Sequence, residues 1–248
     1  MDYEKKRGIS GSTLKIIAIL SMFIDHATAV LIEGSMYNLY REHTSEALLL
    51  YQKLYPYDRI LRSIGRIAFP IFCFLLVEGF IHTRNVKKYV LRLGIFALVS
   101  EIPFDLAFHR QPFYFGYQNV FFTIFLGLLA LICISWAERR YSQKLVQILA
   151  AIVFTAFFAL LATALKTDYY GLGVICIVAF YLGRHTRLNQ ILFGAAAFWF
   201  EFPYAQLSLI PIWFYNGSRG LKLKYFFYVF YPTHLLILYF IAKYVGIY

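Results

Sequence analysis

Charged residues are scarce in this chain: Asp, Glu, Lys and Arg make up 15% of its 248 residues, while 60% are hydrophobic. A soluble domain carries about a quarter charged residues, so this composition argues against one. Cysteines are also few, and Cys73, Cys133 and Cys176 lie in apolar stretches without paired spacing. That pattern indicates neither a disulfide framework nor a metal site, and we predict no bound metal. An internal repeat, a glycine-rich phosphate loop and a low-complexity segment are also lacking, which leaves the apolar residues as the main guide to the fold.

The apolar residues are grouped in blocks of about 18–22 residues, the length of helix that crosses about 30 Å of hydrocarbon. Mean hydropathy is +0.62. We therefore predict an all-α, polytopic transmembrane helical bundle that forms a single domain over residues 1–248, with about nine spans and a range of eight to ten. The predicted spans, of which the sixth to eighth are short, are 14–32, 64–82, 89–108, 120–136, 145–165, 172–182, 191–202, 207–215 and 225–245.

The basic residues indicate how these spans are oriented. The net charge is +11, and most of the 24 Lys and Arg residues lie in alternate loops, beginning with residues 5–7 before the first span. By the positive-inside rule these loops and the N-terminus are cytoplasmic. Because the basic residues alternate between loops, as a membrane topology requires, we predict contact with a lipid bilayer and not with nucleic acid. The long loop at 33–61 is then external, and its mixed charges favour a lid or a short interfacial helix.

The first span contains the most informative pair of residues, Asp25 and His26. An aspartate at membrane depth costs about 2.5–3.5 kcal/mol on insertion scales, so its presence there suggests a function. Lys15 precedes His26 by about three helical turns, so both side chains lie on one face, about 16 Å apart along the axis. Asp25 is turned about 100° away from His26 and would orient it only through local distortion, or else face another helix.

The second span begins with two arginines. Arg62 and Arg66 share a helix face, and Arg66 lies inside the apolar region, where it needs an anion or backbone carbonyls. Pro70 removes a helix hydrogen bond close to Arg66 and is expected to open the helix there. Glu78 lies toward the cytoplasmic end of the same span.

The third span carries one polar stripe. Glu101, Asp105 and His109 follow i, i+4, i+8 spacing, which places them on a single helix face. In one interpretation Arg62 and Arg66 pair with the two acids of this stripe as interhelical clamps. In the other, the same residues support a reaction site, and the two roles are compatible.

The remaining polar residues lie near the ends of spans and in the last span. Asn119 precedes the fourth span and either caps its helix or supplies an amide to a site. Arg84, Lys87 and Lys88 follow the second span on the predicted cytoplasmic side. Tyr231 and His234 flank Pro232 near the middle of the last span.

Five stretches, in order along most of the chain, resemble the TraX family of membrane proteins. They are LKIIAILSMFIDH, GRIAFPIFCFLLVEGFIHTRNVKKY, SEIPFDLAF, QNVFFT and FYPTHLLIL. The family includes the F-pilin N-terminal acetylase and belongs with integral-membrane acyltransferases that use acetyl-CoA. Members of that superfamily often have an arginine, ten intervening residues and a catalytic histidine in an early helix. Lys15 and His26 have this spacing, with lysine in place of arginine.

The resemblance implies an acetyltransferase of the bacterial cytoplasmic membrane, which moves an acetyl group from acetyl-CoA to an amine or hydroxyl. The acceptor would be a peptide or pilin N-terminus or a cell-surface glycan. We predict His26 as general base, with Asp25, Glu101 or Asp105 holding its tautomer and Arg66 stabilising the oxyanion. The residues predicted to contact acetyl-CoA are Lys15, Glu78, Arg84, Lys87, Lys88 and Asn119. Those predicted to contact the acceptor are Arg62, His109, Tyr231 and His234.

Two other functions are compatible with the same residues. Acids and histidines within a membrane also form the relays of proton- or ion-coupled transporters, although such transporters usually show internal repeats and paired broken helices. The chain could also be a non-catalytic membrane assembly factor, in which the polar residues act only as interhelical clamps.

Overall fold

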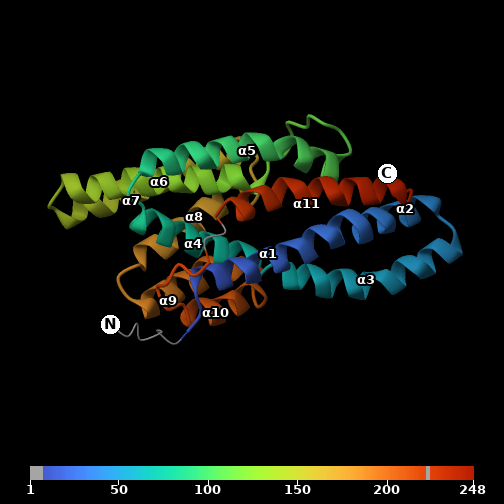
Figure 1. Cartoon of the computed structure of the whole chain (residues 1–248), viewed down its shortest axis with the longest axis horizontal. Coiled ribbons are helices and arrows are strands. Elements are labelled where there is room, and N and C mark those ends of the chain that lie inside the picture. Colours follow the sequence, from blue (N-terminus) through green and yellow to red (C-terminus); the bar gives the residue numbers. More distant parts are fainter. Residues whose placement is uncertain (1–7, 222–223) are drawn as a thin grey trace. The chain divides into compact units, whose positions relative to one another are not determined.

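The computed structural model describes residues 8–221 and 224–248, and these residues are mostly helical (Figure 1). The basic residues 5–7, used for the topology prediction, lie outside the described residues. Outside helices, the described ranges contain two isolated backbone bridges, Ile9 with Tyr215 and Gln118 with Thr167. The elements are α1 (Gly11–Ala27), the π-helix η1 (Thr28–Glu33), α2 (Gly34–Glu42), α3 (Ser45–Gly65), α4 (Ala68–His82), α5 (Val86–His109), α6 (Val120–Arg140), α7 (Lys144–Ala164), α8 (Tyr170–Leu182), α9 (Arg187–Ala197), the 3-10 helices η2 (Trp199–Glu201) and η3 (Ala205–Ser208), α10 (Leu209–Trp213) and α11 (Lys224–Tyr244).

Five helical stretches are long and apolar enough to cross a membrane. They are Gly11–Glu42, Ser45–His82, Val120–Arg140, Lys144–Ala164 and Phe226–Tyr244, while the apolar helix α8 is shorter. Helices satisfy their own backbone hydrogen bonds, which is what hydrocarbon requires of a spanning segment. The predicted all-α helical membrane bundle is thereby confirmed.

The segment at 33–61 differs from the prediction. In place of a lid or a short interfacial helix, α2 continues the first span and the 21-residue helix α3 leads into the second. His43 adopts a left-handed conformation between the two helices, and the Thr44 side chain caps α3 by accepting from the Ala47 N–H. Charged residues lower the average hydropathy of this segment without preventing a helix, so a search for apolar blocks passes over it.

By its internal packing the described chain divides into two compact units, and each is discontinuous in sequence. Unit 1 takes its residues from Met1–Ile71, Ile102–Phe113 and Glu201–Tyr248. Unit 2 takes its residues from Phe72–Glu101 and Tyr114–Phe200. Helices α4 and α5 therefore contribute to both units.

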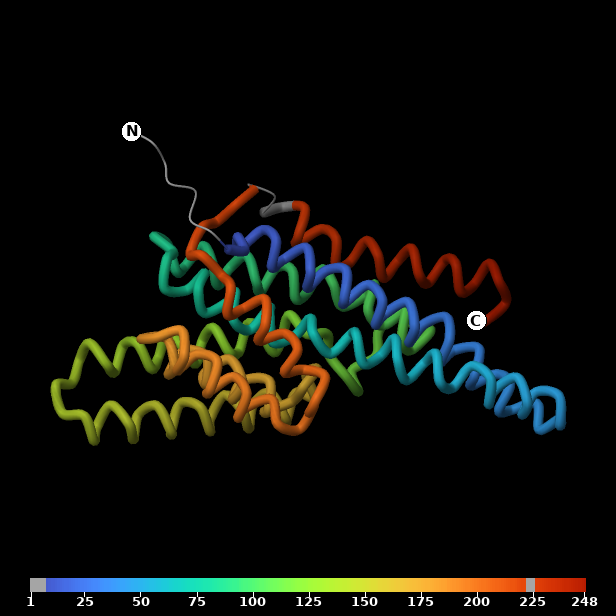
Figure 2. Tube along the Cα trace, turned by 90° about the horizontal axis from the view of Figure 1, so that it is seen from below, coloured from blue at the N-terminus to red at the C-terminus, as the bar shows by residue number. Residues whose placement is uncertain are grey.

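Within unit 1, α1 lies between α3 and α11 (Figure 2). The first helix and α11 run in the same direction, because Lys15 lies over the Phe227 ring at 5.3 Å and Asn38 Nδ2 donates to the Ile247 carbonyl at 2.9 Å. On its other side, α1 is tied to α3 by the Ser21 hydroxyl, which donates to the Ile64 carbonyl at 2.6 Å. These contacts fix the face that α1 turns toward each neighbour.

Unit 2 is built on the antiparallel helices α6, α7 and α8. A methyl group at Gly127 of α6 would occupy the space of the Ile177 side chain of α8, so glycine leaves room for that side chain. At the start of α6, the Asn119 side chain accepts from the Phe121 N–H at 2.9 Å. This bond confirms the predicted cap, because it satisfies one of the free N–H groups of a helix start.

Candidate active site

His26 of α1 and His234 of α11 form a hydrogen-bonded pair in unit 1. His26 Nδ1 lies 2.7 Å from His234 Nε2, and His234 Nδ1 lies 2.7 Å from the Phe230 carbonyl oxygen, one helical turn earlier. The ring planes differ by 6° and the ring centroids are 5.0 Å apart. Because the facing nitrogens are so much closer than the centroids, the rings lie edge to edge. This arrangement is that of an N–H···N hydrogen bond and not of a face-to-face stack.

The Phe230 carbonyl sets the position of the protons in this pair. A carbonyl oxygen only accepts hydrogen bonds, so His234 carries its proton on Nδ1, and in the neutral ring Nε2 then accepts. His26 must therefore donate from Nδ1, which leaves the lone pair of a neutral His26 on Nε2. Within the described residues, Nε2 of His26 has no hydrogen-bond partner, and the side chain is half-buried. The pair thus prepares Nε2 of His26 to accept a proton.

Aromatic rings surround the pair. Phe108 and Tyr231 meet the His26 ring edge-on, with centroids at 5.4 and 5.7 Å. Phe23 lies at 6.1 Å from the His234 ring and Phe230 at 4.8 Å. Such apolar surroundings strengthen the hydrogen bonds within the pair, because water does not compete for them.

The helix changes its winding at Thr28, two residues after His26. Element η1 is a π-helix, and the Thr28 hydroxyl donates to the Ile24 carbonyl at 2.7 Å within this distorted region. In a regular α-helix Glu33 would be turned about 80° away from Asp25. The wider π turns rotate less per residue and bring Glu33 back toward the face of Asp25. Short π segments often occur at functional sites, so this position is informative in itself.

Asp25 faces α3 and not the histidine pair. Arg62 Nη1 lies 2.6 Å from Asp25 Oδ2, and Arg62 Nε lies 3.0 Å from Glu33 Oε1. Of the two alternatives given for Asp25, the structure shows the second, in which it faces another helix. A methyl group at Gly65 would lie 2.4 Å from Asp25 Cβ, so glycine allows the two helices to come together here. In unit 1, Arg62 therefore pairs with Asp25 and Glu33 and not, as the clamp interpretation supposed, with Asp105.

Removal of the Arg62 guanidinium is expected to destabilise unit 1. In Arg62→Ala, Asp25 and Glu33 lose the cation between them. We expect a loss of about 2–3 kcal/mol, below the 3–5 kcal/mol of a fully buried pair, because the Arg62 and Asp25 side chains keep 24% and 17% exposure. Thermal unfolding in detergent measures the loss. The matched control is Arg59→Ala, an exposed position on α3, which should stay within about 0.5 kcal/mol of wild type. Equal shifts in the two variants would contradict a special role for Arg62.

Arg66 lies where the helix between α3 and α4 is interrupted for two residues. Pro70 has no N–H to donate to the Arg66 carbonyl four residues earlier, which explains the interruption as predicted. Arg66 Nη1 lies 3.3 Å from Glu201 Oε1, so the anion expected for this arginine is present in unit 1. The Glu201 side chain is only 12% exposed, so this ion pair is largely shielded from solvent on its acidic side.

The other predicted residues of unit 1 are dispersed. Tyr231 is buried against the histidine pair, while Asp105 is buried and His109 is half-buried in α5. Lys15 is half-buried at the start of α1, and no acidic partner is found for it among the described residues. Arg219 is close enough to Lys15 for the two like charges to repel each other.

The remaining predicted residues belong to unit 2. The Asn119 amide is buried, donates to the Ala97 carbonyl at 2.8 Å and also bonds to Glu101. Glu78 lies 3.5 Å from Gln190 Nε2. The basic residues Arg84, Lys87 and Lys88 are exposed before and at the start of α5. Their assignment to a donor site stays a prediction.

Sequence reasoning did not find two features of the site. Nothing in the sequence pairs His26 of the first span with His234 of the last, and the ring nitrogen expected to face a carboxylate faces His234 instead. Sequence reasoning also omitted Glu33, which sits one π-helical segment beyond Asp25. Helical periodicity could not reveal either feature, because one depends on packing between distant helices and the other on a change of winding.

The fold and the site together define the class of this protein. It is a helical membrane protein with a histidine pair hydrogen-bonded between its first and last candidate spans. Residues 10–242 match the family described as TraX protein, and the chain belongs to this family. It is 30% identical, over 254 aligned residues, to the probable fimbrial assembly protein FimC, serogroup H1, of Dichelobacter nodosus. The alignment covers 92% of this chain and 94% of that protein, and no solved structure matches.

Proposed function

We propose that this protein is an acetyltransferase of the bacterial cytoplasmic membrane, which transfers acetyl groups from acetyl-CoA to an amine or hydroxyl during assembly of a surface fibre. The observation that carries the proposal is the lone pair on Nε2 of His26, whose position follows from the bonds to His234 and Phe230. The fimbrial assembly protein among the relatives supports the biological setting and favours a peptide or pilin-like acceptor over a glycan.

The proposed step needs a base at one place only. The acceptor nitrogen or oxygen attacks the thioester carbonyl, and Nε2 of His26 takes the proton that the acceptor releases. A C–N or C–O bond forms, the C–S bond breaks, and the leaving thiolate takes the proton from His26. During this step the Nδ1–H of His26 stays bonded to His234, which holds the charged ring in place as the third member of a catalytic triad does.

The positions of the cations in unit 1 support an anionic donor. Lys15 and His26 lie on the same face of α1, with Lys15 about 16 Å nearer the start of the helix. It has no acidic partner among the described residues, and the repulsion from Arg219 would be relieved by a phosphate group. Arg66, which is 33% exposed beside Glu201, keeps its proposed role as oxyanion donor.

A non-catalytic assembly protein is the second candidate. The name of the fimbrial relative favours it, since that name states assembly and no chemistry. In that case Asp25, Arg62 and Glu33 would serve only to hold α1 against α3.

Incubation with labelled acetyl-CoA separates the two candidates. Membranes that contain the protein, and membranes that lack it, receive the labelled donor, and mass spectrometry identifies any acetylated peptide or glycan. Acetyl transfer requires label on a defined amine or hydroxyl in the first sample only. If both samples give the same products and the purified protein shows no calorimetric binding of acetyl-CoA, the non-catalytic candidate is preferred.

A further inference from the structure

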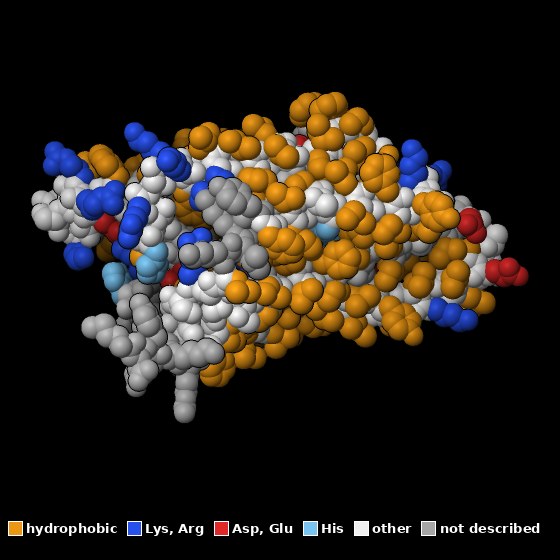
Figure 3. Space-filling model, in the orientation of Figure 1, with side chains coloured by type: hydrophobic (Ala, Val, Ile, Leu, Met, Phe, Trp, Pro, Cys, Tyr) orange, Lys and Arg blue, Asp and Glu red, His pale blue; other side chains and the backbone are white. Residues whose placement is uncertain are grey.

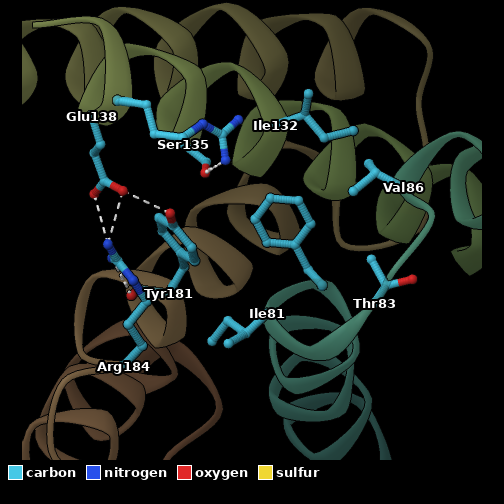
Figure 4. A pocket seen from close by; sticks show the side chains of 10 residues that line it. Ile81, Thr83, Val86, Ile132, Ser135, Glu138, Tyr181 and Arg184 are labelled. Atoms are coloured by element: carbon cyan, nitrogen blue, oxygen red, sulfur yellow. Dashed lines mark hydrogen bonds and ion pairs between the residues drawn. The ribbon is translucent and has the colours of Figure 1, made fainter.

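Unit 2 contains a cavity of about 480 Å³ where α4 and α6 end, α5 begins and α8 ends. Figure 4 shows its two different walls. One wall is largely apolar and includes Ile81, Val86 and Ile132. The facing wall is polar and includes Ser135, Glu138 and Arg184. The lining of the cavity therefore suits a molecule with one polar and one apolar part.

Part of the polar wall is fixed by bonds within it. Arg184 Nη2 donates to both carboxylate oxygens of Glu138 at 2.9 and 2.8 Å, and the Tyr181 hydroxyl donates to Glu138 Oε2 at 2.8 Å. The Arg184 guanidinium also lies 3.8 Å over the Tyr181 ring. Because Glu138 and Arg184 neutralise each other, they form a rigid wall without net charge.

Arg139 gives the cavity its net positive charge. It lines the cavity, and its Nη1 donates to the Ser135 hydroxyl at 3.1 Å. No acidic partner for Arg139 is found in the described part of the chain. A guanidinium has five N–H donors, so most of them remain available to an anion.

Two exposed aromatic side chains at the end of α6 indicate that the cavity lies near a membrane interface. Trp136 and Tyr141 are 50% and 40% exposed at the end of the apolar helix α6, and their rings meet edge-on. Exposed Trp and Tyr at the end of a span mark the headgroup region of a bilayer. Lys and Arg side chains gather over the turn between α6 and α7, while hydrophobic side chains cover the flanks of the helices (Figure 3).

We propose that this cavity binds the headgroup of an anionic phospholipid. The phosphate would lie on the free donors of Arg139, and the glycerol and first methylene groups would lie against Ile81, Val86 and Ile132. Basic pockets between spans at the interface recognise such headgroups. A free phosphate would leave the apolar wall without a partner, which is why the lipid is the better occupant.

Two neighbouring arginines provide a matched test. Arg139→Ala removes the cation that lines the cavity, while Arg140→Ala removes the adjacent cation, which does not line it, and both side chains are exposed. The full-length protein is exchanged into detergent and titrated with phosphatidylglycerol or phosphatidylcholine, and bound lipid is counted by native mass spectrometry. We expect phosphatidylglycerol to bind wild type and Arg140→Ala alike, and Arg139→Ala about fivefold more weakly. Phosphatidylcholine should show no such difference.

Two results would overturn the proposal. Equal weakening by both substitutions would mean that phosphatidylglycerol responds only to the general positive charge of this helix end. Displacement of the lipid by millimolar inorganic phosphate or coenzyme A, with the same dependence on Arg139, would assign the cavity to a soluble phosphate compound. Neither result bears on His26, so the proposed acetyl transfer is tested separately.

Discussion

Replacement of His26 by alanine is expected to lower the rate of the proposed acetyl transfer by about 10²–10⁴-fold, the usual contribution of a positioned general base. The hydrogen bonds to His234 and Phe230 place the lone pair of His26 on Nε2, the ring nitrogen that does not face His234. The substitution removes this proton acceptor. The rate is measured with labelled acetyl-CoA and the acceptor identified as above. Binding of acetyl-CoA should change little, since the predicted donor contacts lie elsewhere.

The control for His26→Ala is His185→Ala. His185 is exposed in the turn after α8 and has no place in the proposed site, so its variant should retain wild-type activity. Thermal unfolding in the same detergent checks that both variants fold. If His26→Ala folds and still transfers acetyl at the wild-type rate, His26 is not the base and the proposed mechanism is wrong.

The fold was predictable from the sequence to the extent that apolar blocks reveal it. Helices α6, α7 and α11 lie within a few residues of the predicted spans, because their apolar runs leave no alternative at membrane depth. Helix α3 was not predicted, although its 21 residues include five leucines, which favour a helix. Its charged residues make it look like a loop, and its position in the fold is set by close packing at Gly65, which composition does not show.

Several side chains of the candidate site stand out in the sequence, but their arrangement does not. Helical geometry alone predicts that the Asp25 and His26 side chains point in different directions, because neighbouring residues of a helix are turned by about 100°. The structure agrees with this prediction. The partner of His26 lies 208 residues away in the sequence, and the side of α11 that faces α1 follows from packing alone. Glu33 pairs with Arg62 because a π-helical segment changes the direction of its side chain, and no pattern of apolar residues predicts such a segment.

His234 provides the sharpest test of the arrangement, because two substitutions of similar size separate hydrogen bonding from packing. His234→Gln keeps an oxygen that accepts from His26 Nδ1 and an amide that donates to the Phe230 carbonyl. His234→Leu fills the space but offers neither bond. We expect the leucine variant to lose about 10²-fold or more in rate, at the lower end of what a general base contributes. The glutamine variant should retain most of the activity.

This comparison also has a spectroscopic readout that does not depend on the acceptor. In wild type, nitrogen NMR of labelled histidine should find the neutral His26 and His234 rings protonated on Nδ1, because each ring donates from that atom. In His234→Gln the His26 ring should keep this tautomer, and in His234→Leu it should become a mixture. If the leucine variant keeps both the tautomer and the rate, His234 only fills space and the proton position of His26 has another cause. If the tautomer becomes mixed while the rate is unchanged, the hydrogen-bonded pair is real but acetyl transfer does not depend on it.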